Sequence, residues 1–122
     1  MADIVVLDAN ALLMPFQFKI NLDLELQRLF GCPDVVVPSS VLGELANAVD
    51  RNAKAALSLA RKYRVIETDL RGDHAVLEMA DRFGAAVVTN DKELIARVRE
   101  RGLRVVRLRS SRHLELTGGP IP

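Results

Sequence analysis

The sequence predicts an α/β fold in three layers, α/β/α, around a central parallel sheet of four or five strands. Its apolar runs are short and rich in Val and Ile, which is typical of strands buried on both faces. Between these runs, apolar residues recur at helical spacing. Alternating strands and helices indicate a parallel sheet with helices on both sides. The expected strands are residues 4–7, 35–37, 65–66, 86–88 and 105–108.

Five helical patterns lie among these strands. One of them, residues 53–62, consists of strong helix formers. The other four are apolar stripes at helical spacing: Leu22, Leu26, Leu29 and Phe30; Val41, Leu42, Leu45, Ala46 and Val49; Ala75, Val76, Met79, Ala80 and Phe83; Leu94, Ile95 and Val98. Residues 1–122 are expected to form a single domain, with a flexible tail from about residue 113.

Residues 14–20 are unusual because apolar and polar side chains alternate in a stretch expected to be a connection. The stretch contains Phe16 and Phe18, two of the four Phe in the chain. Two interpretations stay open. Either these apolar side chains pack into the core, or they form an exposed patch through which two copies make a homodimer.

The composition of the chain excludes several classes of protein. With 122 residues the chain is long enough for one domain with a core. It has no apolar run of about eighteen residues, the length a membrane span needs. Its start lacks the basic region of a signal peptide. The single Cys32, expected to be a buried thiol, excludes a disulfide framework and fits a reducing cytoplasm. One Cys and two His also argue against a zinc site.

The net charge of +1 conceals an asymmetry along the chain. Residues 92–112 carry eight Lys or Arg against Glu93 and Glu100, a net charge of +6 that leaves −5 on the rest. A basic segment beside an acidic pocket suits a polyanionic substrate such as a nucleic acid. The alternative is a solvated helix face followed by an edge strand. The candidate nucleic-acid contacts are Arg97, Arg101, Arg104 and Arg107.

Four acidic residues are expected at one end of the predicted sheet. Asp8 and Asp91 follow strand runs, and Asp73 follows Gly72 at a helix start. Glu44 lies one turn into the helix after the second strand. Ligands of open α/β sheets bind beyond the carboxyl ends of the strands. Carboxylates gathered there repel one another unless a cation holds them, so we predict that Asp8, Glu44, Asp73 and Asp91 bind a divalent metal for phosphoryl or phosphodiester chemistry.

Each acid also has a purely structural explanation. Asp8 could form an Asx-turn at the end of its strand, and Asp73 could cap the helix of residues 74–83. Asp91 could be a first-turn carboxylate, with Asn90 as the capping residue and Glu93 completing a capping box. Glu44 has no capping role in its own helix, but it could simply face solvent. The shared end of the sheet favours one common site over four separate explanations.

Polar residues flank these acids and could orient carboxylates, although turns and helix caps also favour them. They are Asn10, Ser39, Ser40, Thr89 and Asn90. His74, beside Asp73, is expected on a helix surface. The sequence contains no G-x-G-x-x-G, P-loop, G-x-S-x-G or H-E-x-x-H motif, which argues against dinucleotide, P-loop and serine-hydrolase functions.

Four short motifs contain the acids. The first is V-V-L-D-A-N around Asp8, and the second is P-S-S-V-L-G-E-L around Glu44. In the third, Asp73 starts a helix with Ala80 seven residues later, and the fourth is T-N-D ending at Asp91. In this order the four motifs resemble the PIN domain family of small metal-dependent ribonucleases, over about residues 3–108. Within the family the chain looks most similar to archaeal VapC-like toxins and to ribosome-processing nucleases. It departs from these relatives at His74, where they often carry a second acid.

The resemblance implies a cytoplasmic endoribonuclease that hydrolyses RNA phosphodiester bonds. In that family Asp8, Glu44, Asp73 and Asp91 would be catalytic and would hold one or two magnesium or manganese ions, with Thr89 and Asn90 supporting them. The implied partners are RNA and, for a toxin, an antitoxin protein. Two alternatives remain. One is a catalytically silent PIN module that binds RNA or a protein, and the other is a phosphatase or receiver-like domain that uses Asp8 as phospho-acceptor.

Overall fold

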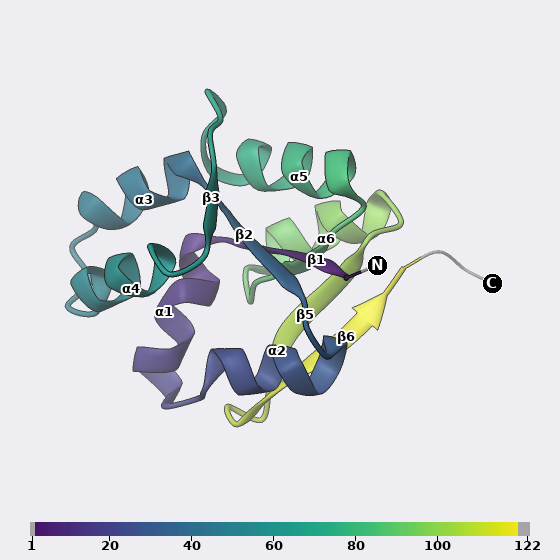
Figure 1. Ribbon diagram of the computed structural model, residues 1–122, viewed down its shortest axis with the longest axis horizontal. Coiled ribbons are helices and arrows are strands. Elements are labelled where there is room, and N and C mark those ends of the chain that lie inside the picture. The colour runs from purple at the N-terminus through teal and green to yellow at the C-terminus, as the bar shows by residue number, and fades with distance from the viewer. Residues whose placement is uncertain (1, 120–122) are drawn as a thin grey trace.

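The computed structural model describes residues 2–119, which form six strands and six helices around one sheet (Figure 1). The strands are β1 (Ile4–Leu7), β2 (Asp34–Pro38), β3 (Arg64–Ile66), β4 (Ala86–Val88), β5 (Arg104–Arg109) and β6 (His113–Gly118). The helices are α1 (Ala9–Phe18), α2 (Leu22–Phe30), α3 (Ser39–Ala46), α4 (Ala53–Ala60), α5 (Gly72–Phe83) and α6 (Lys92–Glu100). The predicted α/β fold is confirmed.

The strand order in the sheet is β3-β2-β1-β4-β5-β6. The first five strands are parallel, and β6 pairs antiparallel with β5. From the central β1, the chain first builds outward through β2 and β3 and then returns to the other side with β4. The carboxyl ends of β1 and β4 are therefore neighbours at the point where the strand order reverses, the usual position of a ligand site in such sheets.

Alternate side chains of the strands face two separate cores, as expected for a sheet buried on both faces. Val5 and Leu7 pack with α1 to α4, whereas Val6 packs with α5 and α6. Figure 1 shows these two helical layers on opposite sides of the sheet. None of the helices in residues 2–119 is long and apolar enough to cross a membrane.

The stretch of residues 14–20 is mainly helical, not a connection. It forms the last part of α1, which contains Pro15. The alternation of apolar and polar side chains pointed away from a helix here. A proline inside a helix also removes a hydrogen-bond donor and is therefore uncommon. Met14 and Ile20 are buried, while Phe16 and Phe18 are each 39% exposed. Part of the stretch therefore packs into the core and part of it is exposed, and the homodimer stays a prediction.

The tail predicted to be flexible from about residue 113 instead forms β6, a sixth strand. A hairpin turn joins β5 to β6 and places Ser110 and Ser111 at φ 55° and 56°. The loop has three residues, 110–112, and turn positions with positive φ usually carry Asn or Gly, so Ser-Ser gave no turn signal. Residues 120–122 of the predicted tail lie outside the described residues.

Two smaller expectations were wrong. Val49 is fully exposed because α3 ends at Ala46, where the Asn47 side chain donates to the Gly43 carbonyl at 3.0 Å. Cys32 is exposed because it lies in the turn after α2, between Gly31 and Pro33.

Candidate active site

All four predicted acids line one small cavity of about 150 Å³ at the carboxyl ends of β1 and β4. Asp8 directly follows β1 and Asp91 follows β4, so two adjacent parallel strands bring them to the same end of the sheet. Asp73 enters from the first turn of α5, and Glu44 from α3. The remaining walls of the cavity are Ala9, Asn10, Val41, Gly72 and Val76.

Asp8 is the most buried acid of the cavity, with 8% of its surface exposed. It caps α1, because its Oδ1 accepts a hydrogen bond from the Ala11 amide at 2.7 Å. Burial raises the pKa of Asp8 to about 7, against the opposing effect of hydrogen bonds from Thr89 and Ala11. The charges of Asp73 and Asp91 raise that pKa further. The structural role of Asp8 is thus a helix cap, where the sequence suggested an Asx-turn, and this role does not explain why three like-charged carboxylates meet in one cavity.

Asp91 is the N-cap of α6, a position that the sequence had assigned to Asn90. Its Oδ1 accepts hydrogen bonds from the Glu93 and Leu94 amides at 2.9 and 3.2 Å. Asp73 is not a cap, because α5 begins one residue earlier, at Gly72. Burial raises the pKa of Asp73, the charge of Asp91 adds to this, and the charge of Arg97 opposes it.

Asn10 and Asn90 form a clamp across the carboxyl ends of three strands. The Asn10 Oδ1 accepts a hydrogen bond from the Asn90 amide, and the Asn90 Oδ1 accepts one from the Leu108 amide, both at 2.8 Å. The clamp fixes the loop between Asp91 and β4 against α1 and β5. The fully buried Thr89 adds a third constraint, since its Oγ1 accepts from the Asp91 amide at 3.0 Å.

The other polar neighbours play smaller parts. Ser39 exchanges hydrogen bonds with the Thr68 backbone, which ties α3 to the segment before α5. The Ser40 hydroxyl oxygen is buried and has no hydrogen-bond partner among the described residues. His74 is exposed on α5, as the sequence predicted.

Glu44 makes a contact that the sequence did not suggest. Its Oε1 accepts a hydrogen bond from the Gly72 amide at 3.0 Å, across 28 positions in the chain. Gly72 is thus a functional neighbour that sequence reasoning missed. The only signal for it was its place directly before Asp73 in an R-G-D-H helix start.

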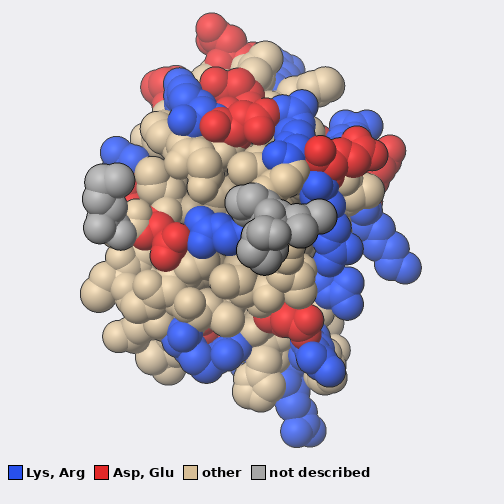
Figure 2. All heavy atoms as spheres, turned by 90° about the vertical axis from the view of Figure 1, so that its right-hand side faces the viewer, with Lys and Arg blue, Asp and Glu red and all other residues tan. Residues whose placement is uncertain are grey.

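The four predicted arginine contacts do not lie together. Arg97 is close enough to Asp73 for its charge to lower the pKa of that carboxyl, and Arg107 is exposed on β5. Arg101 and Arg104 lie at the opposite end of the sheet, where they pair with Asp81 and Asp3. On the face of the molecule that Figure 2 shows, Lys and Arg side chains gather along one border, with Asp and Glu side chains among them.

The donor set of the cavity fits a hard divalent cation. Within residues 2–119 no three His, Cys, Asp or Glu side chains already lie close enough together to hold one ion directly. The cavity nevertheless offers four carboxylates and the side chain of Asn10, and burial together with mutual repulsion raises the pKa of Asp8 and Asp73. A divalent cation would relieve this repulsion, and oxygen donors suit magnesium or manganese better than zinc.

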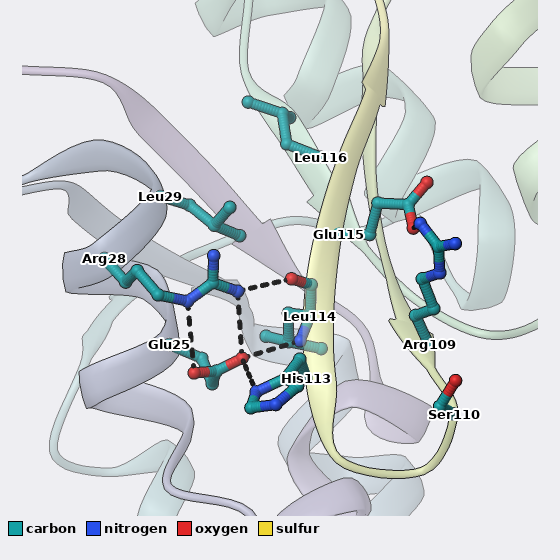
Figure 3. Close-up of a pocket in the computed structure, with 9 residues that line it drawn as sticks. All are labelled: Glu25, Arg28, Leu29, Arg109, Ser110, His113, Leu114, Glu115 and Leu116. Atoms are coloured by element: carbon teal, nitrogen blue, oxygen red, sulfur yellow. Dashed lines mark hydrogen bonds and ion pairs between the residues drawn. The ribbon is translucent and has the colours of Figure 1, made fainter.

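A larger cavity of about 650 Å³ lies elsewhere, between α2 and the β5–β6 hairpin (Figure 3). There the Glu25 Oε1 accepts from the Leu114 amide at 2.7 Å, and the Arg28 guanidinium donates to the Leu114 carbonyl at 2.6 Å. These bonds satisfy the outer backbone groups of an edge strand, which would otherwise be free to pair with another chain. This region therefore serves to dock α2 on the sheet, and the smaller acidic cavity is the candidate active site.

Comparisons with known proteins identify the family. Residues 5–111 match the family model described as a PIN like domain. The chain is 30% identical over 116 residues to Ribonuclease VapC9 of Archaeoglobus fulgidus. This alignment covers 89% of this chain and 85% of that protein. It is 29% identical over 126 aligned positions to Ribonuclease VapC4 of Methanocaldococcus jannaschii, covering 93% of this chain and 96% of that protein.

The same fold occurs in the solved structure of the PIN domain endonuclease Utp24. The two structures superpose with a TM-score of 0.80 at 22% sequence identity, over 98% of this chain and 96% of the other. Sequence and fold thus agree, and the chain belongs to the PIN domain family.

Proposed function

We propose that this chain is a metal-dependent endoribonuclease that hydrolyses phosphodiester bonds in RNA. The observation that carries the proposal is the meeting of Asp8, Asp73 and Asp91 in one cavity, close enough for their charges to raise the pKa of Asp8. Membership in the PIN domain family and two relatives named as ribonucleases support the same activity.

In this proposal Asp8, Asp73, Asp91 and Glu44 hold magnesium or manganese, directly or through water. The chemistry that such a cation supplies is activation of water for in-line attack and neutralisation of the charge that builds on the phosphate. The chain's own contribution is positioning. Thr89 and the Asn10–Asn90 clamp hold Asp8 and Asp91 in place, so the carboxylates need little reorganisation during the reaction.

RNA is proposed to approach the cavity from the side of α6. Arg97 is the basic residue whose charge already acts on Asp73, and Arg107 extends the basic surface along β5. Arg101 and Arg104, which the sequence suggested as nucleic-acid contacts, lie at the far end of the sheet in ion pairs and are not part of this approach. The few aromatic residues of the chain make base stacking a minor part of binding.

The experiment that tests this function is cleavage of labelled single-stranded and structured RNA with manganese, with magnesium and with EDTA. We expect cleavage with either metal and none with EDTA. The variant Glu100→Gln is a matched control for substitutions of the cavity acids, because Glu100 is an exposed acid at the carboxyl end of α6, away from the cavity. Cleavage that persists in EDTA would refute metal dependence. RNA binding without cleavage under any metal would instead support the silent-module alternative.

The biological setting is either a toxin with an antitoxin partner or an RNA-processing enzyme, in both cases cytoplasmic. The two relatives named VapC favour the first. Expression of a toxin should arrest growth, and co-expression of the product of a small adjacent gene should relieve the arrest. No arrest, together with defective RNA maturation when the gene is deleted, would favour processing.

A homodimer is proposed through the exposed end of α1. Phe16 and Phe18 are each 39% exposed there, beside a groove of about 430 Å³ that Pro15 and Ile20 help to line. Size-exclusion chromatography with light scattering should give twice the 13.5 kDa mass of one chain. The double variant Phe16→Glu, Phe18→Glu should give a folded monomer, because it places charges in the interface. A monomeric wild-type protein at high concentration would contradict the proposal.

A further inference from the structure

A second cavity adjoins the acidic one. It has a volume of about 290 Å³ and is lined by Ser40, Gly43, Glu44, Asn47 and Arg71. Glu44 lines both cavities, so the two are neighbours. The first four lining residues lie on one face of α3 at helical spacing, and Arg71, directly before α5, forms the opposite wall. The second cavity is therefore a groove along α3, the α3 groove, which begins at the edge of the acidic cavity.

Hydrogen bonds at two points hold the walls of the α3 groove together. The Ser39 hydroxyl exchanges hydrogen bonds with the Thr68 backbone, and the Gly72 amide donates to the Glu44 Oε1 at 3.0 Å. Both connections join α3 to the segment of residues 68–72, which carries Arg71. A groove with fixed walls binds a ligand at a low cost in conformational entropy.

Gly43 leaves space in this groove that the fold itself does not require. It lies inside α3, where glycine is less favourable than alanine. Its φ is not positive, and a Cβ added to it would meet no atom within 4 Å. No backbone conformation or close contact within residues 2–119 therefore explains this glycine. A ligand backbone that lies against α3 would explain it, since glycine allows such a close approach.

The α3 groove also contains polar groups that have no partner in the protein. The Arg71 side chain is exposed and forms no ion pair within residues 2–119, unlike Arg101 and Arg104. The Ser40 hydroxyl oxygen has no hydrogen-bond partner in the same part of the chain. Guanidinium and hydroxyl groups are both good donors to phosphate oxygens. The unpaired positive charge therefore favours an anionic ligand with a backbone, which describes RNA.

We propose that the α3 groove binds the phosphate of the nucleotide next to the scissile bond, with Arg71 as the cation that contacts it and Gly43 as the point where the RNA backbone lies against α3. In the sheet, β1 lies between β2, which precedes α3, and β4, which precedes α6. RNA that reaches the acidic cavity from the side of α6 would therefore leave it along α3. This deepens the proposed function, on which the placement beside the scissile bond rests.

The first test is RNA binding in EDTA, which needs no cleavage. Measured by fluorescence anisotropy with a short labelled single strand, Arg71→Gln should bind about tenfold more weakly than the wild type, the scale of a lost hydrogen bond to a charged group. The slope of log affinity against log salt concentration should fall by about 0.7, the value for one phosphate contact on a single strand.

Arg61→Gln is the matched control for Arg71→Gln. It removes the same charge from an exposed arginine that follows α4 and precedes β3, at the end of the sheet opposite the acidic cavity. We expect its RNA affinity and salt dependence to match those of the wild type. Equal effects of the two substitutions would overturn the proposal, because the arginine would then act only through net charge.

The second test compares stability with RNA affinity at Gly43. Gly43→Ala should raise the midpoint of thermal unfolding, because alanine favours the helix and its Cβ meets nothing. It should nevertheless weaken RNA binding, and Gly43→Leu should weaken it further. Ser58→Ala, an exposed position on α4 that lines neither cavity, should add stability without loss of affinity. Unchanged RNA affinity in Gly43→Leu would overturn the placement of RNA against α3.

The third test places the α3 groove relative to the scissile bond. RNAs with one cleavage site are shortened stepwise from either side, and kcat/KM is measured with manganese. The ratio of wild type to Arg71→Gln should fall towards one when the neighbouring phosphate is removed on one side, and should persist when the other side is shortened. A ratio that responds to neither would overturn the placement. A wild type without cleavage would refute the proposed function, while binding in EDTA would still decide whether the groove holds RNA.

Discussion

Replacing Asp8 by asparagine is expected to abolish RNA cleavage and, at the same time, to stabilise the metal-free protein. The loss of activity should be at least about a hundredfold, since the variant removes a buried charge from the proposed metal site. The gain in stability follows from the position of the carboxyl, which is 8% exposed and faces two like charges. Asparagine keeps the oxygen that accepts the Ala11 amide, so the cap of α1 should survive.

The gain in stability should depend on pH. The pKa of Asp8 is raised from 3.8 to about 7 in the folded protein, so the folded state binds a proton that the unfolded state has released. This contribution to stability is fully present below the unfolded pKa and is lost as the pH rises through the folded pKa. Between pH 5 and pH 8 the wild type should lose on the order of 3 kcal/mol from Asp8, and Asp8→Asn should not.

Urea denaturation in EDTA at a series of pH values measures this difference. The gap in unfolding free energy between Asp8→Asn and the wild type should widen from pH 5 to pH 8. When manganese replaces EDTA, the gap in unfolding free energy at pH 8 should narrow, because the cation stabilises the ionised wild-type carboxylate and not the amide. Parallel pH profiles for the two proteins would show that Asp8 has an ordinary pKa, and the electrostatic argument for the site would fail.

Asp91 is expected to combine two functions that different substitutions separate. It caps α6 through the Glu93 and Leu94 amides, and it belongs to the acidic cavity. Asparagine is as good an N-cap as aspartate, while alanine is not. Both Asp91→Asn and Asp91→Ala should lose cleavage by about a hundredfold or more, because both remove the charge.

Only the alanine variant should lose the cap. We expect Asp91→Ala to be less stable than Asp91→Asn by about 1 kcal/mol, the usual value of an N-cap. The comparison is made between the two variants because both also relieve the repulsion on Asp8. Thermal and urea unfolding of both in EDTA measure the difference. Equal stability would show that the cap is unimportant, and cleavage retained in Asp91→Asn would remove Asp91 from the site.

The sequence predicted the parallel strands well because both faces of the sheet are buried. Apolar runs such as residues 86–88 favour buried strands over other local structures, and the helical stripes between them show which face of each helix is buried. The signal was weak for β6, whose Leu114 and Leu116 alternate with polar residues after a Ser-Ser turn. It was misleading for α1, because apolar and polar side chains alternate over residues 14–20, where the helix also contains Pro15.

The positions of the aspartates could also be predicted, because they are fixed by short-range rules. Asp8 and Asp91 follow adjacent parallel strands, so chain direction alone brings them to one end of the sheet. Their roles as caps could be predicted less well, since Asn90 and Asp91 are both good capping residues at consecutive positions. Asp91 is the N-cap in the structure, because hydrogen bonds to Asn10 and Leu108 hold Asn90 elsewhere.

The sequence by itself determined the fold class, the family motifs and the set of acids at one end of the sheet. These depend on local patterns of burial and on chain direction, which a single sequence records. Only the tertiary structure decided which arginines face the cavity, that the clamp joins Asn10 to Asn90, and that Glu44 meets Gly72. Such contacts join residues far apart in the chain, and they depend on helix packing distances that no local spacing encodes.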